Sequence, residues 1–126
     1  MIFSAMIKSS FFGLLTYYEF NNLINYNRGG LMSVSMSEVL NMYNPKIIDI
    51  RDNYSYNLGH IKNAINIPYY NLLNNYSHYL NKQEKYYLYC DNGKQSLEIS
   101  NRLNLFGYNT VNIIGGYDEY SNYKYY

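Results

Sequence analysis

Short apolar runs alternate with helical patterns along most of this chain, and that alternation restricts the fold more than any other feature. Lys46–Ile50 is rich in β-branched residues, which is typical of a strand buried on both faces of a sheet. Strands separated by helices are usually parallel, with helices covering both faces. The sequence therefore predicts an α/β fold with a central, mostly parallel sheet of about five strands. The other predicted strands are Ala64–Pro68, Tyr86–Cys90 and Thr110–Ile114.

Between these runs, apolar residues recur at the three- and four-residue spacing of a helix. Ser35 or Ser37 is placed to cap a first short helix, and Pro45 ends it. Gly107 supplies a stop for the helix that precedes the last strand. The remaining helices are predicted at Tyr69–Tyr79, Ser96–Phe106 and Asp118–Tyr120.

The size and charge of the chain argue against several classes of protein. With 126 residues it is long enough for one domain, which buries roughly two-thirds of its unfolded surface without a disulfide or metal. A formal net charge of +1 and the lack of a basic run give no electrostatic basis for nucleic-acid binding. The single cysteine forms no internal disulfide, which favours a reducing, cytoplasmic compartment.

Residues 1–32 differ in composition from the rest, and residues 33–126 are predicted to form the domain. Met1–Leu15 is apolar but is interrupted by serines and a lysine, so it lacks the roughly 20 continuous apolar residues of a spanning helix. It also lacks the small-residue cleavage site of a signal peptide. We expect an amphipathic or loosely ordered extension, with membrane contact of residues 1–30 as the minority interpretation. Translation from Met32 or Met36 is a further alternative.

Cys90 ends the third predicted strand and opens the loop Cys90–Ser96, directly before a predicted helix. A thiol at this position faces a helix N-terminus, where main-chain N–H dipoles favour the thiolate over the thiol. The same loop can hold an anion. Because parallel sheets carry their ligand sites at the carboxyl ends of strands, Cys90 is the candidate nucleophile and sulfur chemistry is considered first. A buried structural thiol is the alternative.

Three segments, in this order along Ser35–Tyr120, together resemble the rhodanese-like domain. Asp49–Arg51 followed by Gly59–Pro68 is similar to the family's D-V-R and G-H-I-x-G-A-x-N-I-P signature. The loop Cys90–Ser96 is similar to the family's catalytic loop, commonly C-x-x-G-x-R-S. Leu105–Tyr117 resembles the terminal segment, in which a Gly-aromatic pair is followed by L-x-G-G. The resemblance implies a rhodanese-like fold and a single-domain sulfurtransferase of the thiosulfate type.

The resemblance also implies a two-step reaction at Cys90. The thiolate attacks the outer sulfur of a donor such as thiosulfate, expels sulfite and holds the sulfur as a persulfide. A thiophilic acceptor, which is cyanide, a thiol or a protein cysteine, then takes that sulfur. The expected partners are therefore a small sulfur-containing anion and a thiol or protein acceptor, and no cofactor is expected.

The expected active site is the loop that follows Cys90. Backbone N–H groups from Asp91 to Ser96 are expected to surround the thiolate and its sulfur, and Gly93 lets the loop turn tightly. Ser96 is expected either to cap the next helix or to hydrogen-bond the sulfur. Lys94 is expected to attract an anionic donor, although Asp91 partly offsets its charge. The expected substrate-binding residues are Asp91, Asn92, Gly93, Lys94, Gln95 and Ser96.

Three residues outside the loop are expected to support it. Asp49 and Arg51 are interpreted as a structural ion pair at a strand end, which orients the loop from below. His60 is interpreted as a packing or hydrogen-bonding residue of the turn that follows Gly59. One cysteine and two distant histidines make no metal-ligand cluster, so no metal site is predicted.

The chain departs from the family pattern at a few positions, and these departures support alternative functions. Gln95 stands where the loop commonly has Arg, Ser55 where an acid is frequent, and Tyr120 where a Trp often packs. Lys94 compensates as a point charge but lacks the bidentate fork of Arg. The main alternative is therefore a sulfur carrier or a non-catalytic binding module of the same fold. A cysteine phosphatase is weaker, because its loop needs an Arg where this chain has Ser96.

Overall fold

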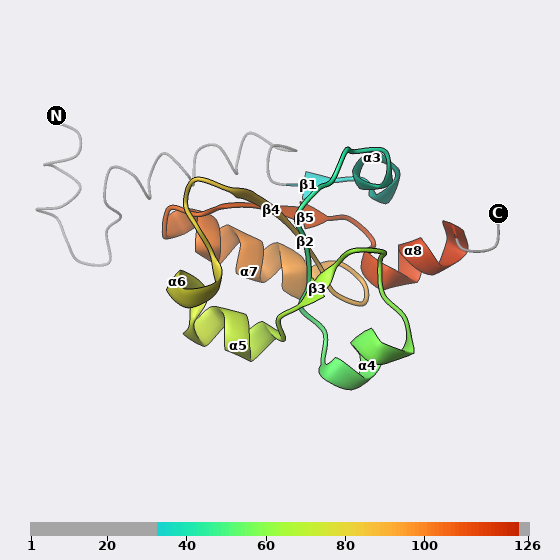
Figure 1. The fold of residues 1–126 in the computed structure, drawn as a ribbon, viewed down its shortest axis with the longest axis horizontal. Helices are drawn as coiled ribbons and strands as arrows, with labels where there is room; N and C mark the ends of the chain where they lie inside the picture. Colours follow the sequence, from blue (N-terminus) through green and yellow to red (C-terminus); the bar gives the residue numbers. More distant parts are fainter. Residues whose placement is uncertain (1–32, 124–126) are drawn as a thin grey trace, which may run out of the picture.

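A computed structural model describes residues 33–123, which form a five-stranded sheet covered by helices (Figure 1). The strands are β1 (Ser33–Val34), β2 (Ile47–Asp49), β3 (Ile65–Asn66), β4 (Lys85–Tyr89) and β5 (Asn109–Ile113). Their order across the sheet is β1-β5-β4-β2-β3, and every neighbouring pair is parallel. The predicted α/β fold with a parallel central sheet is confirmed.

Helices cover both faces of the sheet (Figure 1). They are α3 (Met36–Leu40), α4 (Asn53–Leu58), α5 (Tyr69–Asn74), α6 (Tyr76–Tyr79), α7 (Lys94–Leu105) and α8 (Gly116–Tyr123). Helices α5, α6 and α7 pack against one face, and α3 and α8 pack against the other. Helix α4 buries none of its residues and follows the carboxyl end of β2.

The side chains of β4 divide the interior into two cores. Tyr86, Leu88 and Cys90 contribute to the core beneath α5 and α7, whereas Tyr87 and Tyr89 contribute to the core beneath α3 and α8. This division follows from the two-residue period of a strand, which sends successive side chains to opposite faces. Cys90 continues that alternation, so its sulfur is on the α7 face of the sheet.

The first described helix begins as the sequence predicts, and Ser35 rather than Ser37 is its cap. The Glu38 N–H donates to Ser35 Oγ at 3.1 Å, and the Ser35 N–H donates to Glu38 Oε1 at 3.0 Å. This reciprocal pair is a capping box, which satisfies two N–H groups that the first turn of a helix leaves without partners.

Three predicted helices differ in their limits from those observed. The C-terminal helix, predicted at Asp118–Tyr120, is longer and spans Gly116–Tyr123. The predicted helix Tyr69–Tyr79 is divided at Asn75, whose φ of −139° and ψ of 34° are not helical. The Asn75 side-chain amide donates to the Asn71 carbonyl, a bond that competes with continuation of the helix. Helix α7 begins at Lys94, two residues before the predicted start at Ser96. The loop after Cys90 is therefore shorter than predicted.

The predicted N-terminal extension over residues 1–32 lies outside the described residues, as do the last three residues, 124–126. Among residues 33–123, no helix combines the length and the apolar character that crossing a membrane would require. The predictions of an amphipathic segment and of membrane contact therefore remain predictions.

Candidate active site

Cys90 directly follows β4 at the carboxyl end of the sheet, and only 3% of its surface is exposed. The chain then turns back into α7 through Gly93, which has a φ of 94°. This left-handed conformation favours glycine because a Cβ atom is strained there. A Cβ at Gly93 would also lie 3.0 Å from the Gly115 nitrogen. The tight turn predicted at Gly93 is present.

The sulfur of Cys90 lies within hydrogen-bonding distance of three groups. The Gly93 and Ser96 N–H groups donate to Sγ at 3.2 Å and 3.4 Å. Ser96 Oγ is 3.4 Å from Sγ. Main-chain N–H groups at the N-terminus of α7 therefore donate to the sulfur, as the sequence predicts.

Fewer main-chain N–H groups face the sulfur than the sequence predicts. The Lys94 N–H donates to Asn92 Oδ1 at 2.9 Å and therefore does not face the sulfur. The expected helix cap at Ser96 is also wrong, because α7 begins at Lys94 and the cap residue is Gly93. Ser96 is fully buried and makes the alternative contact, with the sulfur.

The N-terminus of α8 holds the carbonyl groups of the same loop. The Tyr117 N–H donates to the Cys90 carbonyl at 2.8 Å, and the Asp118 N–H donates to the Asp91 carbonyl at 2.9 Å. This close approach requires Gly116, whose φ is 58°. A Cβ at Gly116 would overlap the Cys90 carbonyl oxygen and lie 2.7 Å from the Asp91 carbonyl oxygen. The two helix ends therefore fix the loop from opposite sides.

Gly116→Ala is expected to lower the free energy of unfolding by about 1–3 kcal/mol, because it combines a steric overlap with a strained backbone. Chemical denaturation followed by circular dichroism measures the change. Gly59→Ala is the matched control, because Gly59 has a φ of 167°, an extended conformation that alanine adopts. Equal losses in the two variants would contradict the close approach at Gly116.

Asp49 and Arg51 form the predicted ion pair, and it is buried. Arg51 Nη2 lies 2.7 Å from Asp49 Oδ2, and the two side chains are 5% and 0% exposed. The Tyr89 hydroxyl donates to the same carboxylate oxygen at 2.6 Å. Burial raises the pKa of Tyr89, and the hydrogen bond to Asp49 raises that pKa further. Burial lowers the pKa of Arg51, but the hydrogen bonding and charge of Asp49 outweigh this and raise it.

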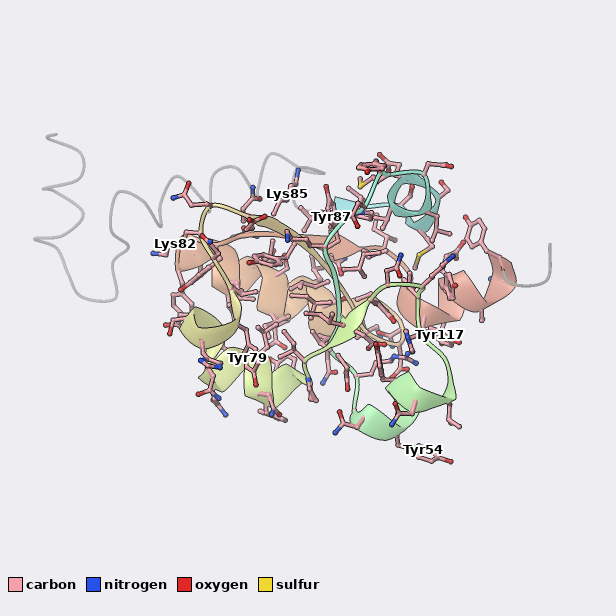
Figure 2. The ribbon with its side chains drawn as sticks, in the orientation of Figure 1. Tyr54, Tyr79, Lys82, Lys85, Tyr87 and Tyr117 are labelled. Atoms are coloured by element: carbon pink, nitrogen blue, oxygen red, sulfur yellow. The ribbon has the colours of Figure 1, made fainter. Side chains whose placement is uncertain are left out.

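Arg51 connects this ion pair to the loop and to α8. Its guanidinium carbon lies 4.1 Å from the ring centroid of Tyr117, which is labelled beside α8 in Figure 2. Its Nη1 is 3.8 Å from Asp91 Oδ1, and its Nη2 donates to the Gly59 carbonyl at 2.7 Å. Arg51 therefore contacts the loop after Cys90, the helix that holds that loop and the turn before β3.

Among residues 33–123, the His60 ring contacts Tyr56 and not the sulfur. The ring stacks on Tyr56, with centroids 3.7 Å apart, and Nδ1 lies 2.8 Å from the Tyr56 carbonyl oxygen. This agrees with the packing and hydrogen-bonding role predicted for His60. Tyr54, from the same helix, points away from the domain into solvent (Figure 2).

A shallow hollow of about 300 Å³ opens at Cys90. Its charged residues are Lys94 and Asp91, which are exposed and of opposite sign, so the field on an incoming anion is weak. Gln95 stands there without charge, as the sequence indicates. The residues that line the hollow are Cys90, Asp91, Asn92, Lys94 and Gln95.

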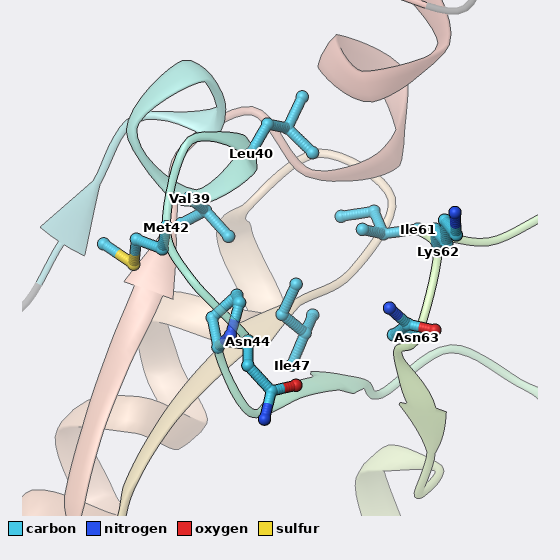
Figure 3. A pocket seen from close by; sticks show the side chains of 9 residues that line it. Val39, Leu40, Met42, Asn44, Ile47, Ile61, Lys62 and Asn63 are labelled. Atoms are coloured by element: carbon cyan, nitrogen blue, oxygen red, sulfur yellow. The ribbon is translucent and has the colours of Figure 1, made fainter.

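A second hollow, of about 250 Å³, lies between α3 and the segment before β3 (Figure 3). Val39, Ile47 and Ile61 make its wall largely apolar. Neither Cys90 nor any residue of its loop lines this hollow. In the described part of the chain, no group of three or more His, Cys, Asp or Glu residues is arranged to hold a metal ion.

Comparisons with known proteins agree with the observed fold. The sequence model of the family described as "Rhodanese-like domain" matches residues 34–123. No curated protein sequence matches the chain. The family model therefore covers the sheet, the helices and the loop that carries Cys90.

Several solved structures are similar in fold. A protein from Staphylococcus saprophyticus is 32% identical, with a TM-score of 0.64, and the match covers 70% of this chain and 91% of that one. A rhodanese-related protein from Thermoplasma volcanium is 26% identical, with a TM-score of 0.67, covering 72% and 91%. A human single-domain sulfurtransferase is 22% identical, with a TM-score of 0.58, covering 74% and 97%. Since the family model spans most of the sequence, the chain belongs to the rhodanese-like domain family.

Proposed function

We propose that this protein is a sulfurtransferase that moves a sulfane sulfur through a persulfide on Cys90. The observation that carries the proposal is the donation of the Gly93 and Ser96 N–H groups to Cys90 Sγ, at 3.2 Å and 3.4 Å. A thiolate and the persulfide that it forms are both anionic acceptors, and fixed N–H donors stabilise both. The family match and the fold shared with a protein named a single-domain sulfurtransferase support the same function.

In the first step, the Cys90 thiolate attacks the outer sulfur of a donor such as thiosulfate. A sulfur–sulfur bond to Cys90 forms while the donor's sulfur–sulfur bond breaks, and sulfite leaves with the electron pair of the broken bond. Lys94 is the cation that lines the hollow at Cys90. Lys94 supplies the attraction for an anionic donor, although Asp91 partly offsets it, and the loop amides receive the charge on sulfur.

In the second step, an acceptor attacks the outer sulfur of the persulfide. The bond between the two sulfurs breaks, and the Cys90 thiolate leaves with the electron pair, so the enzyme returns to its starting state. Cyanide would give thiocyanate, and a thiol would give a new persulfide. A protein acceptor must approach the exposed rim formed by Asp91, Asn92 and Gln95.

A sulfur carrier or binding module of the same fold is the second candidate. It is favoured by the charges around the hollow, where Lys94 is opposed by Asp91 and Gln95 adds none. Arg51 is buried and bound to Asp49, so it does not replace the missing loop cation. A phosphatase is disfavoured because Arg102 lies in the last turn of α7, far along the helix from the loop.

Incubation with thiosulfate, followed by intact mass spectrometry, tests the proposal. We expect a gain of about one sulfur atom per chain, and release of thiocyanate when cyanide is added. The chain has a single cysteine, so the gain reports on Cys90 alone. A stable adduct without thiocyanate would indicate a carrier, and the absence of any adduct would indicate a binding module.

A further inference from the structure

A second buried polar residue stands behind the serine that touches the sulfur. Ser96 Oγ lies 3.4 Å from Cys90 Sγ and donates its proton to Asn112 Oδ1 at 2.6 Å. Cys90, Ser96 and Asn112 are 3%, 0% and 4% exposed, so water competes little for these bonds. Asn112 belongs to β5, the strand beside β4, and packs against the serine from the sheet.

The direction of the serine hydroxyl decides which form of Cys90 is stabilised. A hydroxyl has one proton, and here that proton points to Asn112. The oxygen then offers only lone pairs to the sulfur, which suits a protonated thiol that donates to it. A thiolate needs the opposite arrangement, with the Ser96 proton turned toward Sγ.

Asparagine serves both arrangements. Its side-chain amide has an acceptor end and a donor end, and rotation by half a turn exchanges them. With Oδ1 toward Ser96, the thiol donates to Ser96 Oγ and the Ser96 hydroxyl donates to Asn112. With Nδ2 toward Ser96, Asn112 donates to the serine oxygen, and the serine proton is released to the sulfur. An ionised Asp only accepts hydrogen bonds, and Leu neither donates nor accepts them.

We infer that Asn112 is a positioning residue that acts through Ser96 to set the ionisation of the Cys90 nucleophile. The inference rests on the proposed function, because it concerns the sulfur that attacks the donor. Asn112 is not a catalytic residue, since Ser96 separates it from the reacting atom.

Other charged and titratable groups lie on the loop and on the elements packed against it, and these groups must stay constant in the test. Asp91 and Lys94 line the same hollow, and Arg51 reaches the Asp91 carboxylate. Further titratable groups lie on α5, α7 and α8, the helices that pack against the core of Cys90 or hold its loop, and they are unchanged by substitution at position 112; they are Tyr69, Glu98, Tyr117, Asp118 and Glu119.

The rate of Cys90 alkylation by iodoacetamide, measured across pH, tests the inference. The reagent is neutral and the chain has one cysteine, so the pH of half-maximal rate reports the ionisation of this sulfur alone. Asn112→Asp is expected to raise that midpoint by about one pH unit or more, because the carboxylate retains the Ser96 proton and adds negative charge. Asn112→Leu, which removes both ends of the amide, is expected to give an intermediate midpoint.

The same substitutions in a Ser96→Ala background are the matched control. If Asn112 acts through the hydroxyl, Asn112→Leu shifts the midpoint in the wild type but not beside Ser96→Ala, and the shift by Asn112→Asp shrinks. Equal shifts in both backgrounds, or a midpoint of Asn112→Leu equal to that of the wild type, would overturn the inference. Should Asn112→Asp fail to fold, the Asn112→Leu pair still decides between these outcomes.

This readout separates the inference from the proposed function. Alkylation needs no sulfur donor, whereas persulfide formation does. The predicted order of midpoints with no sulfur uptake from thiosulfate would leave Asn112 as a positioning residue and reject that donor chemistry. If sulfur is taken up but substitutions at position 112 do not change the alkylation midpoint, the function is retained and the role of Asn112 is rejected.

Discussion

Cys90→Ser is expected to abolish both the persulfide adduct and the release of thiocyanate. A serine hydroxyl is not ionised near neutral pH, and an oxygen does not hold a sulfane sulfur as a persulfide does. We expect turnover with thiosulfate and cyanide to fall at least about a thousandfold, to the rate without protein. Intact mass spectrometry and the thiocyanate assay measure the two losses independently.

The folded state is expected to survive this change, which makes the result interpretable. Serine is close to cysteine in shape, and the Gly93 and Ser96 N–H groups that donate to Sγ are placed to donate to its oxygen. Cys90→Ala provides the matched control, since it removes the reactive atom and leaves no replacement. Thiocyanate release that persists in both variants would reject the proposed function, because no other cysteine exists in the chain.

The strands that carry the site were predictable because their apolar residues are continuous and their ends are marked. β2, β4 and β5 lie within one residue of the predicted limits at both ends. The second predicted strand is shorter than expected, since Ala64–Pro68 pairs only at Ile65–Asn66. Pro68 has no N–H to donate to a ladder and instead precedes helix α5.

Two elements are not predicted because they carry no periodic signal. β1 consists of Ser33–Val34, too short for an alternation to be seen, and it is recognised only through its pairing with β5. Helix α4 buries none of its residues, so its side chains show no apolar face. Its one local signal is the cap, where Asp52 Oδ1 accepts from the Ser55 N–H at 2.8 Å. Ser55 thus serves the start of α4.

The loop residues of the candidate site were predictable from their position, but the partner of Ser96 was not. The sequence places Cys90 before a helix N-terminus, and the donors of Gly93 and Ser96 follow from that placement. Asn112 lies on another strand, and only the parallel pairing of β4 with β5 brings it to Ser96. No spacing rule within the chain indicates such a contact. An asparagine between Val111 and Ile113 is the one signal available, because a buried amide requires a partner.

Asp49→Ala is expected to be the most destabilising of the substitutions considered, with a loss of about 3–5 kcal/mol in the free energy of unfolding. The change leaves the Arg51 guanidinium buried without its carboxylate and removes the acceptor of the Tyr89 hydroxyl. In a domain of this size each kcal/mol is worth about 4–8 °C, so the melting temperature should fall by at least about 12 °C. Calorimetry or thermal circular dichroism measures it.

Glu84→Ala is the matched control, since it removes the acid of an exposed ion pair. Lys46 Nζ and Glu84 Oε1 are 3.7 Å apart, and the side chains are 57% and 43% exposed. Exposed pairs are worth about 0–1 kcal/mol, because water and salt screen them. The contrast follows from desolvation rather than distance: a charge buried without its partner has lost its water, whereas an exposed one regains it. Similar losses for Asp49→Ala and Glu84→Ala would mean that Arg51 reaches solvent once Asp49 is gone, and that the ion pair does not hold the loop after Cys90 in place.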